Sequence, residues 1–140
     1  MLENISLAIS SVCGAQCIFC PSHMGKNVLP NTMPYETVEK IAAEISSEKF
    51  KQFHLIKKIH IGEIGDCFLN NDIIRILRLF KSRVPDIHIN AYTNFHHFTP
   101  DKTDIILQEK LIDSVACDID GSNKENYFNV KKLSLPKTVD

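Results

Sequence analysis

Three cysteines with short, regular spacing are the side chains of this sequence best suited to metal chemistry. Cys13, Cys17 and Cys20 form a C-x3-C-x2-C pattern. Thiolates are soft ligands suited to zinc and to iron–sulfur clusters, and short spacings let one loop wrap around a metal centre. Three thiolates leave one coordination position without a protein ligand, as catalytic metal centres require. The pattern therefore favours a three-cysteine 4Fe–4S cluster with one open iron.

Two other interpretations of these cysteines stay open. His23 follows Cys20 closely and offers a fourth ligand for a structural zinc site of the Cys3His type. Such zinc sites usually pair two separated ligand clusters, whereas these four candidates fall within eleven positions. Alternatively, the thiols could pack in an apolar core, as free cysteines often do. The spacing on one loop favours a cluster over zinc, and zinc over a core without metal.

The elements that must position the cysteines follow from the apolar periodicity. Alternating apolar residues predict strands near residues 5–9, 56–61, 87–91 and 112–119. Helical spacing predicts helices that begin near residues 34, 72, 99 and 123. A capping box formed by Ser122 and Glu125 marks the start of the last one. Strands that alternate with helices indicate an α/β fold with a parallel sheet and right-handed crossovers.

Glycine and polar residues follow each predicted strand. The cysteines follow the first strand, residues 62–66 the second, Thr93 and Asn94 the third, and Asp118 and Asp120 the fourth. Ligands of parallel α/β sheets bind beyond the carboxyl ends of the strands. We therefore expect one shared site rather than four unrelated loops.

With these clusters in place, the sequence resembles the radical S-adenosylmethionine (radical SAM) superfamily. The cysteine loop after a first strand, with Phe19 just before its last cysteine, is similar to that family's signature. The stretch Gly-Glu-Ile-Gly-Asp at 62–66 resembles the glycine-rich segment that follows strand two in the family and ends in Gly-Glu-Pro. Here Ile64 replaces the first glycine of the usual pair, Asp66 replaces the glutamate, and Cys67 replaces the proline.

The resemblance continues after the third and fourth strands. Thr93-Asn94 is similar to the family's Thr-Asn-Gly, although Phe95 stands in place of the glycine. The segment Asp-Ile-Asp-Gly at 118–121 resembles Ser-x-Asp-Gly, with aspartate in place of the serine. The loop of residues 20–34 is similar to the subgroup that often carries a C-terminal SPASM extension.

The resemblance implies a cofactor, a chemistry and a set of binding residues. A 4Fe–4S cluster on the three cysteines would cleave S-adenosylmethionine (SAM) reductively and generate a 5′-deoxyadenosyl radical that abstracts hydrogen from a substrate. A flavodoxin- or ferredoxin-like protein would supply the single electron. The residues implied to bind SAM are Phe19, Gly62, Gly65, Asp66, Asn94, Asp118 and Asp120. Peptide, sugar and small-molecule substrates all stay open.

Several of these residues also have an ordinary structural interpretation. The two glycines suit tight turns, and the two later aspartates suit caps at a strand end. Cys67 and Cys117 are expected to be small buried apolar residues rather than ligands. His96 and His97 are expected in a surface loop, because adjacent side chains diverge.

The length of the chain limits how much of the family's fold these residues can form. The 140 residues suffice for about four strand–helix units, and residues 1–140 are expected to form a single incomplete domain. The resemblance implies a truncated partial (β/α) barrel that covers the first two thirds of the family's core and leaves strand four as an open edge. A second chain could complete it, the gene could be split or truncated, or the domain could be a degenerate relic. The alternative function is a non-catalytic zinc or iron–sulfur module that binds a partner chain.

Composition excludes other classes of function. The formal net charge is −1, and no run of Lys or Arg suggests a nucleic-acid or membrane-surface footprint. The sequence shows neither a signal-peptide pattern nor an apolar run of the roughly 20 residues that span a bilayer. An odd count of 5 cysteines, three of them clustered, is unlike a disulfide framework. We therefore expect a soluble cytoplasmic protein.

Overall fold

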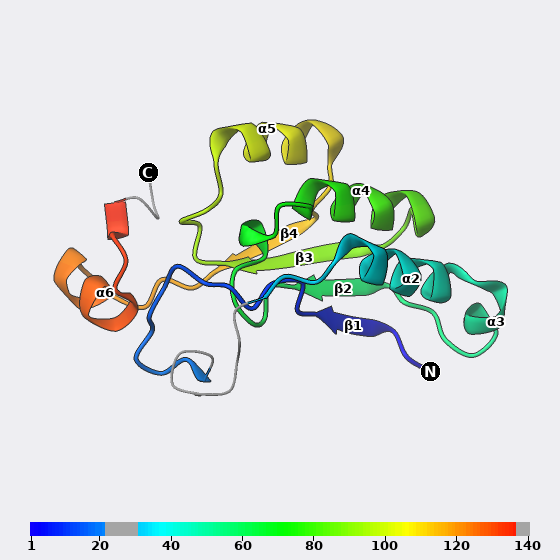
Figure 1. The fold of residues 1–140 in the computed structure, drawn as a ribbon, viewed down its shortest axis with the longest axis horizontal. Coiled ribbons are helices and arrows are strands. Elements are labelled where there is room, and N and C mark those ends of the chain that lie inside the picture. The colour runs from blue at the N-terminus through cyan, green and yellow to red at the C-terminus, as the bar shows by residue number, and fades with distance from the viewer. Residues whose placement is uncertain (22–30, 137–140) are drawn as a thin grey trace.

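The computed structural model describes residues 1–21 and 31–136 and has a four-stranded parallel sheet at its centre (Figure 1). The strands are β1 (Asn4–Leu7), β2 (Lys58–Ile61), β3 (His88–Thr93) and β4 (Ser114–Cys117), and they lie in that order. The helices are α2 (Tyr35–Ser46), α3 (Glu48–Lys51), α4 (Ile73–Arg83), α5 (Pro100–Glu109) and α6 (Lys124–Lys131), with a 3-10 turn η1 (Cys67–Leu69). The predicted α/β fold with four parallel strands is confirmed.

Helices α2, α4 and α5 lie along one face of the sheet, and α6 lies beyond the carboxyl ends of the strands (Figure 1). The covered face is apolar because the register places Ile5, Ile59 and Ile89 side by side. These side chains pack with Val38 of α2 and Phe80 of α4 in one core. Within the described residues, no helix has both the length and the apolar character needed to cross a bilayer.

The opposite face of the sheet carries a polar row. Its members are Ser6, His60, Asn90 and Ser114, which are neighbours in register across all four strands. The Ser114 hydroxyl donates to Asn90 Oδ1 at 2.7 Å, and the Asn90 amide nitrogen lies 3.3 Å from His60 Nδ1. Period-2 alternation along the strands therefore separates an apolar core face from a hydrogen-bonding face. In the part of the chain that the structure describes, no helix covers this second face (Figure 1).

Two of the differences between the observed and the predicted element boundaries have a clear local cause. The first strand ends at Leu7, because the chain turns there: the Ile9 amide donates to the Leu7 carbonyl at 3.1 Å. The cap of α6 is Asn123 rather than Ser122, since the Asn123 side chain accepts a hydrogen bond from the Asn126 amide at 2.9 Å. The predicted Ser122–Glu125 capping box is therefore wrong by one residue at the cap. Asparagine is as good an N-cap as serine, so propensity alone did not separate the two.

Asp113, just before β4, joins three elements. Its Oδ2 accepts from the Ile89 amide of β3 at 2.7 Å and from Lys81 Nζ of α4 at 2.7 Å. Burial alone would raise the pKa of this carboxyl, but the hydrogen bonds from Lys81 and Ile89 outweigh burial and hold the pKa below its ordinary value.

An acid-dependent loss of stability follows from Asp113. A depressed pKa in the folded state contributes stability that is complete above the unfolded pKa and is lost as the pH falls toward the folded pKa. We expect Asp113→Asn to cost about 1 kcal/mol at neutral pH and progressively less on acidification below about pH 4. Urea unfolding of both proteins across this range checks it. A cost that is independent of pH would contradict the assignment.

Candidate functional site

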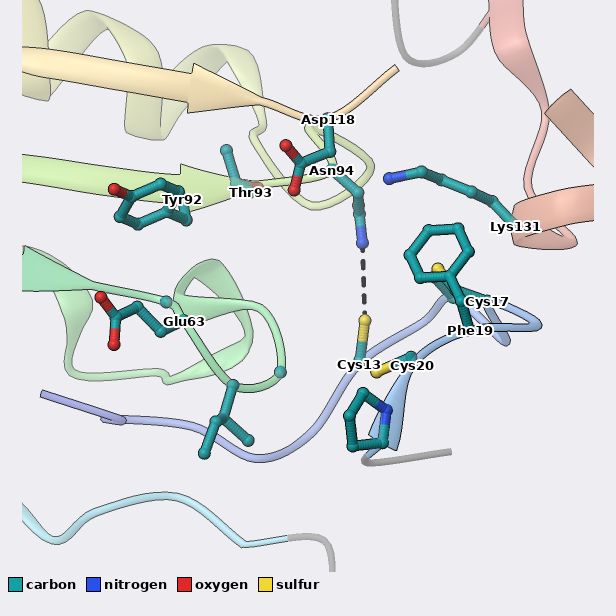
Figure 2. Close-up of a pocket in the computed structure, with 15 residues that line it drawn as sticks. Cys13, Cys17, Phe19, Cys20, Glu63, Tyr92, Thr93, Asn94, Asp118 and Lys131 are labelled. Atoms are coloured by element: carbon teal, nitrogen blue, oxygen red, sulfur yellow. Dashed lines mark hydrogen bonds between the residues drawn. The ribbon is translucent and has the colours of Figure 1, made fainter. Parts of the chain in front are cut away.

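A cavity of about 460 Å³ opens at the carboxyl ends of the strands (Figure 2). Of the ten residues singled out in the sequence, eight line it: Cys13, Cys17, Phe19, Cys20, Gly62, Gly65, Asn94 and Asp118. Asp66 and Asp120 lie outside the lining. The expectation of one shared site at this end of the sheet agrees with this arrangement.

The cysteine loop is held in place from two sides. Asn94, after β3, directs its amide nitrogen to Cys13 Sγ at 3.6 Å, the dashed contact in Figure 2. On the other side, the amides of Gln16 and Ile18 donate to the carbonyls of Lys131 and Val130 at 2.9 and 3.0 Å. Two backbone hydrogen bonds to carbonyls at the end of α6 therefore hold the loop that carries the thiols.

The thiols of Cys13, Cys17 and Cys20 line the same cavity. Burial raises the pKa of Cys13 and Cys17, nearby thiols raise it further, and the Lys131 ammonium opposes these effects. In residues 1–21 and 31–136, no three His, Cys, Asp or Glu side chains converge closely enough to hold one metal ion. His23, the alternative zinc ligand, lies outside the described residues.

Gly62 and Gly65 form a tight loop between β2 and the cavity. Their φ angles are 91° and 70°, a region that favours glycine. A Cβ on Gly65 would lie 2.7 Å from the Val12 carbonyl oxygen, and one on Gly62 would collide with the Tyr92 carbonyl. Backbone packing therefore requires both glycines as turn residues, while both also line the cavity.

Asp66 is completely buried and acts inside the loop. Its Oδ1 accepts from the Phe68 amide at 3.0 Å, and its Oδ2 accepts from the Thr93 hydroxyl at 2.9 Å. Its own amide donates to the Val12 carbonyl at 2.8 Å. Asp66 therefore ties the loop after β2 to the end of β3 and to the segment before Cys13. The role in SAM binding that the resemblance implies for Asp66 stays a prediction.

Lys131 is a site residue that the sequence did not single out. Its side chain is only 5 % exposed and lines the cavity (Figure 2). The Lys131 ammonium forms an ion pair with Asp120 at 2.8 Å. Burial alone would lower the pKa of this ammonium, but the Asp120 partner outweighs burial and raises it. The available signal was helical spacing, because Lys131 follows the fully buried Tyr127 by one turn of α6. Glu63 and Tyr92 also line the cavity and were not singled out.

The remaining cysteines and histidines match the sequence expectations in part. Cys67 is fully buried, as expected, and its Sγ lies 3.7 Å from the Tyr92 carbonyl oxygen. Cys117 is only half-buried. His96 and His97 are half-buried rather than fully on the surface.

A comparison with protein-family models identifies the family. The model described as the Radical SAM superfamily matches residues 7–139. The chain belongs to the radical SAM superfamily. The matched range contains every residue that lines the cavity. No curated protein matches this radical SAM chain.

Solved structures show the same fold. BtrN in complex with AdoMet and 2-DOIA is 17 % identical and matches over 99 % of this chain and 54 % of its own, with a TM-score of 0.73. Native anSMEcpe with bound AdoMet is 16 % identical over 98 % of this chain and 37 % of its own, with a TM-score of 0.67. Methylornithine synthase (PylB) is 16 % identical over 99 % and 39 %, with a TM-score of 0.65. This radical SAM chain therefore spans about half of BtrN, and less of the others.

The comparisons confirm the partial-barrel fold. The four βα units of this chain match radical SAM structures along almost its full length. Membership of the SPASM-like subgroup stays a prediction, and most of the loop that suggested it, residues 22–30, lies outside the described residues.

Proposed function

We propose that this chain binds a 4Fe–4S cluster through Cys13, Cys17 and Cys20 and cleaves SAM reductively. When bound, the cluster would supply the electron that breaks a carbon–sulfur bond of SAM and yields the 5′-deoxyadenosyl radical. One observation carries the proposal: the three thiols line one cavity together with the glycine loop after β2 and Asn94 after β3.

The cavity walls suggest how the chain would hold SAM. The positive φ angles at Gly62 and Gly65 keep side chains off the wall and let a ligand approach the backbone closely. Asp118 and Glu63 present carboxylates to the cavity and suit the ammonium and hydroxyl groups of SAM. Phe19 is 56 % exposed at the rim and offers an aromatic face for the adenine.

The polar row supports a polar substrate. It continues into the cavity through Glu63, which accepts from the Ser6 hydroxyl at 2.9 Å, and through Tyr92, whose ring stacks on His60 at 5.9 Å. Burying the polar groups of this row without hydrogen-bond partners costs free energy, so ligands that leave them unpaired bind less well. We therefore expect hydroxyl, amide or amine groups on the molecule from which hydrogen is abstracted.

Strand β4 lies at an edge of the sheet, where a further strand has room to pair. Among the described residues, β4 pairs only with β3, and Val115 on it is 40 % exposed. Open edges invite pairing with further strands. We propose that additional strands, from the same polypeptide or from a second chain, pair with β4, and that a flavodoxin- or ferredoxin-like reductant delivers the electron.

Anaerobic reconstitution tests the proposal. With iron and sulfide, the wild-type chain is expected to take up one 4Fe–4S cluster whose electron paramagnetic resonance signal changes on adding SAM. Cys13→Ala, Cys17→Ala and Cys20→Ala should each lose most of the cluster, whereas Cys117→Ala, outside the loop, should retain it. One tightly bound zinc per chain and no SAM cleavage after reduction would instead establish the non-catalytic metal module.

A further inference from the structure

We propose that Lys131, oriented by Asp120, is a positioning residue that places a positive charge beside the cysteine loop and stabilises the reduced state of its cluster. The inference rests on the cluster proposed above. It assigns functions to the last turn of α6 and to Asp120 that differ from the SAM contact implied by the sequence.

The backbone of α6 fixes Lys131 against the loop. Its carbonyl accepts from the Gln16 amide at 2.9 Å, and the preceding carbonyl, of Val130, accepts from Ile18 at 3.0 Å. Tyr127, one turn earlier on the same helix, is fully buried. These backbone hydrogen bonds join Lys131 and Val130 to the residues on either side of Cys17. They do not depend on the side chain of Lys131.

The ammonium of Lys131 is buried where a lysine could have reached solvent. Lysines near a helix end usually extend the charged group into water, and burying an ammonium is costly unless it is paired. Here the side chain is 5 % exposed and points into the cavity (Figure 2). Its partner is Asp120, at 2.8 Å. Asp120 thus offsets the cost of burial and fixes the direction of the charge.

The ammonium of Lys131 shares the cavity with the cysteine thiols and a carboxylate. Cys13 and Cys17 line the same cavity as Lys131. Asp118 lies on the same cavity wall. Among the described residues that line the cavity, Lys131 supplies the one cationic side chain.

A single buried cation next to thiolate ligands has a definite electrostatic consequence. A cluster held by three thiolates is an anion, and reduction adds a further negative charge. Net charge around a cluster is one of the factors that set its potential. In a partly desolvated cavity the attraction is screened less than in water. Lys131 therefore favours the reduced state and makes the potential less negative, whereas Asp120 opposes it.

Opposite shifts of the reduction potential test this inference. In reconstituted protein without SAM at pH 7, Lys131→Met should make the midpoint potential more negative, and Lys131→Arg should restore it. Asp120→Asn removes a negative charge but leaves the ammonium, so the potential should become less negative. Lys132→Met is the matched control, because that ammonium sits over the Phe128 ring at 5.4 Å, outside the cavity lining, and its removal should leave the potential unchanged.

The outcomes separate this inference from the proposed function. If the wild-type chain takes up no cluster, both the proposed function and the proposed role of Lys131 are overturned. If it holds a cluster but Lys131→Met and Asp120→Asn leave the potential unchanged or shift it in the same direction, only the role of Lys131 is overturned. A purely structural ion pair would reduce cluster retention in both variants without opposite shifts. Lys131→Gln gives a second charge-removing variant if the methionine variant does not fold.

Discussion

Replacing Gly65 with alanine is expected to lower the free energy of unfolding by more than about 3 kcal/mol. The residue has a φ of 70°, which already penalises any side chain. The new Cβ would also lie 2.7 Å from the Val12 carbonyl oxygen and 2.8 Å from the Ser11 carbonyl carbon. These are backbone atoms of the segment that leads into Cys13, so relief requires that segment to move. Urea unfolding measures the loss, and cluster uptake should fall with it.

Gly14→Ala is the matched control for this substitution. Gly14 lies next to Cys13, but its added Cβ would meet the side chain of His97, with Nε2 at 2.6 Å, rather than backbone. A side chain can rotate away, so we expect a loss of at most about 1 kcal/mol. Equal losses in the two variants, or an unchanged stability of Gly65→Ala, would refute the argument that backbone packing imposes glycine at position 65.

The parts of the fold that could be predicted rest on local periodicity. Ile59 and Ile61 alternate with polar residues in β2, and Ile89 and Ala91 do so in β3, so the strands were recognisable one by one. Once the alternation with helices implied a parallel sheet, the carboxyl ends of the strands had to lie together. This is why cysteines, glycines and an asparagine from distant segments could be assigned to one cavity before any contact was known.

The parts that could not be predicted depend on contacts between distant segments. Nothing in the pattern of α6 indicates that Val130 and Lys131 accept hydrogen bonds from the cysteine loop, more than a hundred residues earlier. The same limit applies to Asp66. The motif marked its carboxylate as a ligand group, but only the tertiary structure shows that Thr93 and Phe68 already donate to it.

Asp66→Ala is the second substitution with a large expected effect. It removes the acceptor of two buried donors, the Phe68 amide and the Thr93 hydroxyl. Leaving buried donors without partners costs about 1–3 kcal/mol each, so for two donors we expect a loss of about 2–6 kcal/mol in urea unfolding. Asp86→Ala, at an exposed aspartate, is the control and should change stability by less than about 0.5 kcal/mol.

A double-mutant cycle with Thr93→Val separates a structural role of Asp66 from a ligand-binding one. The Thr93 hydroxyl donates to Asp66 and accepts from the Phe95 amide at 3.0 Å, so the three groups form one chain of hydrogen bonds. If Asp66 stabilises the loop through this chain, Thr93→Val should cost about 1–2 kcal/mol less in the Asp66→Ala background than in the wild type. If Asp66 serves only to bind SAM, the two costs should add, and Asp66→Ala should weaken SAM binding without lowering the stability of the ligand-free protein. The burial of the carboxylate and its two short contacts favour strong coupling, because neither partner can turn to water when the other is removed.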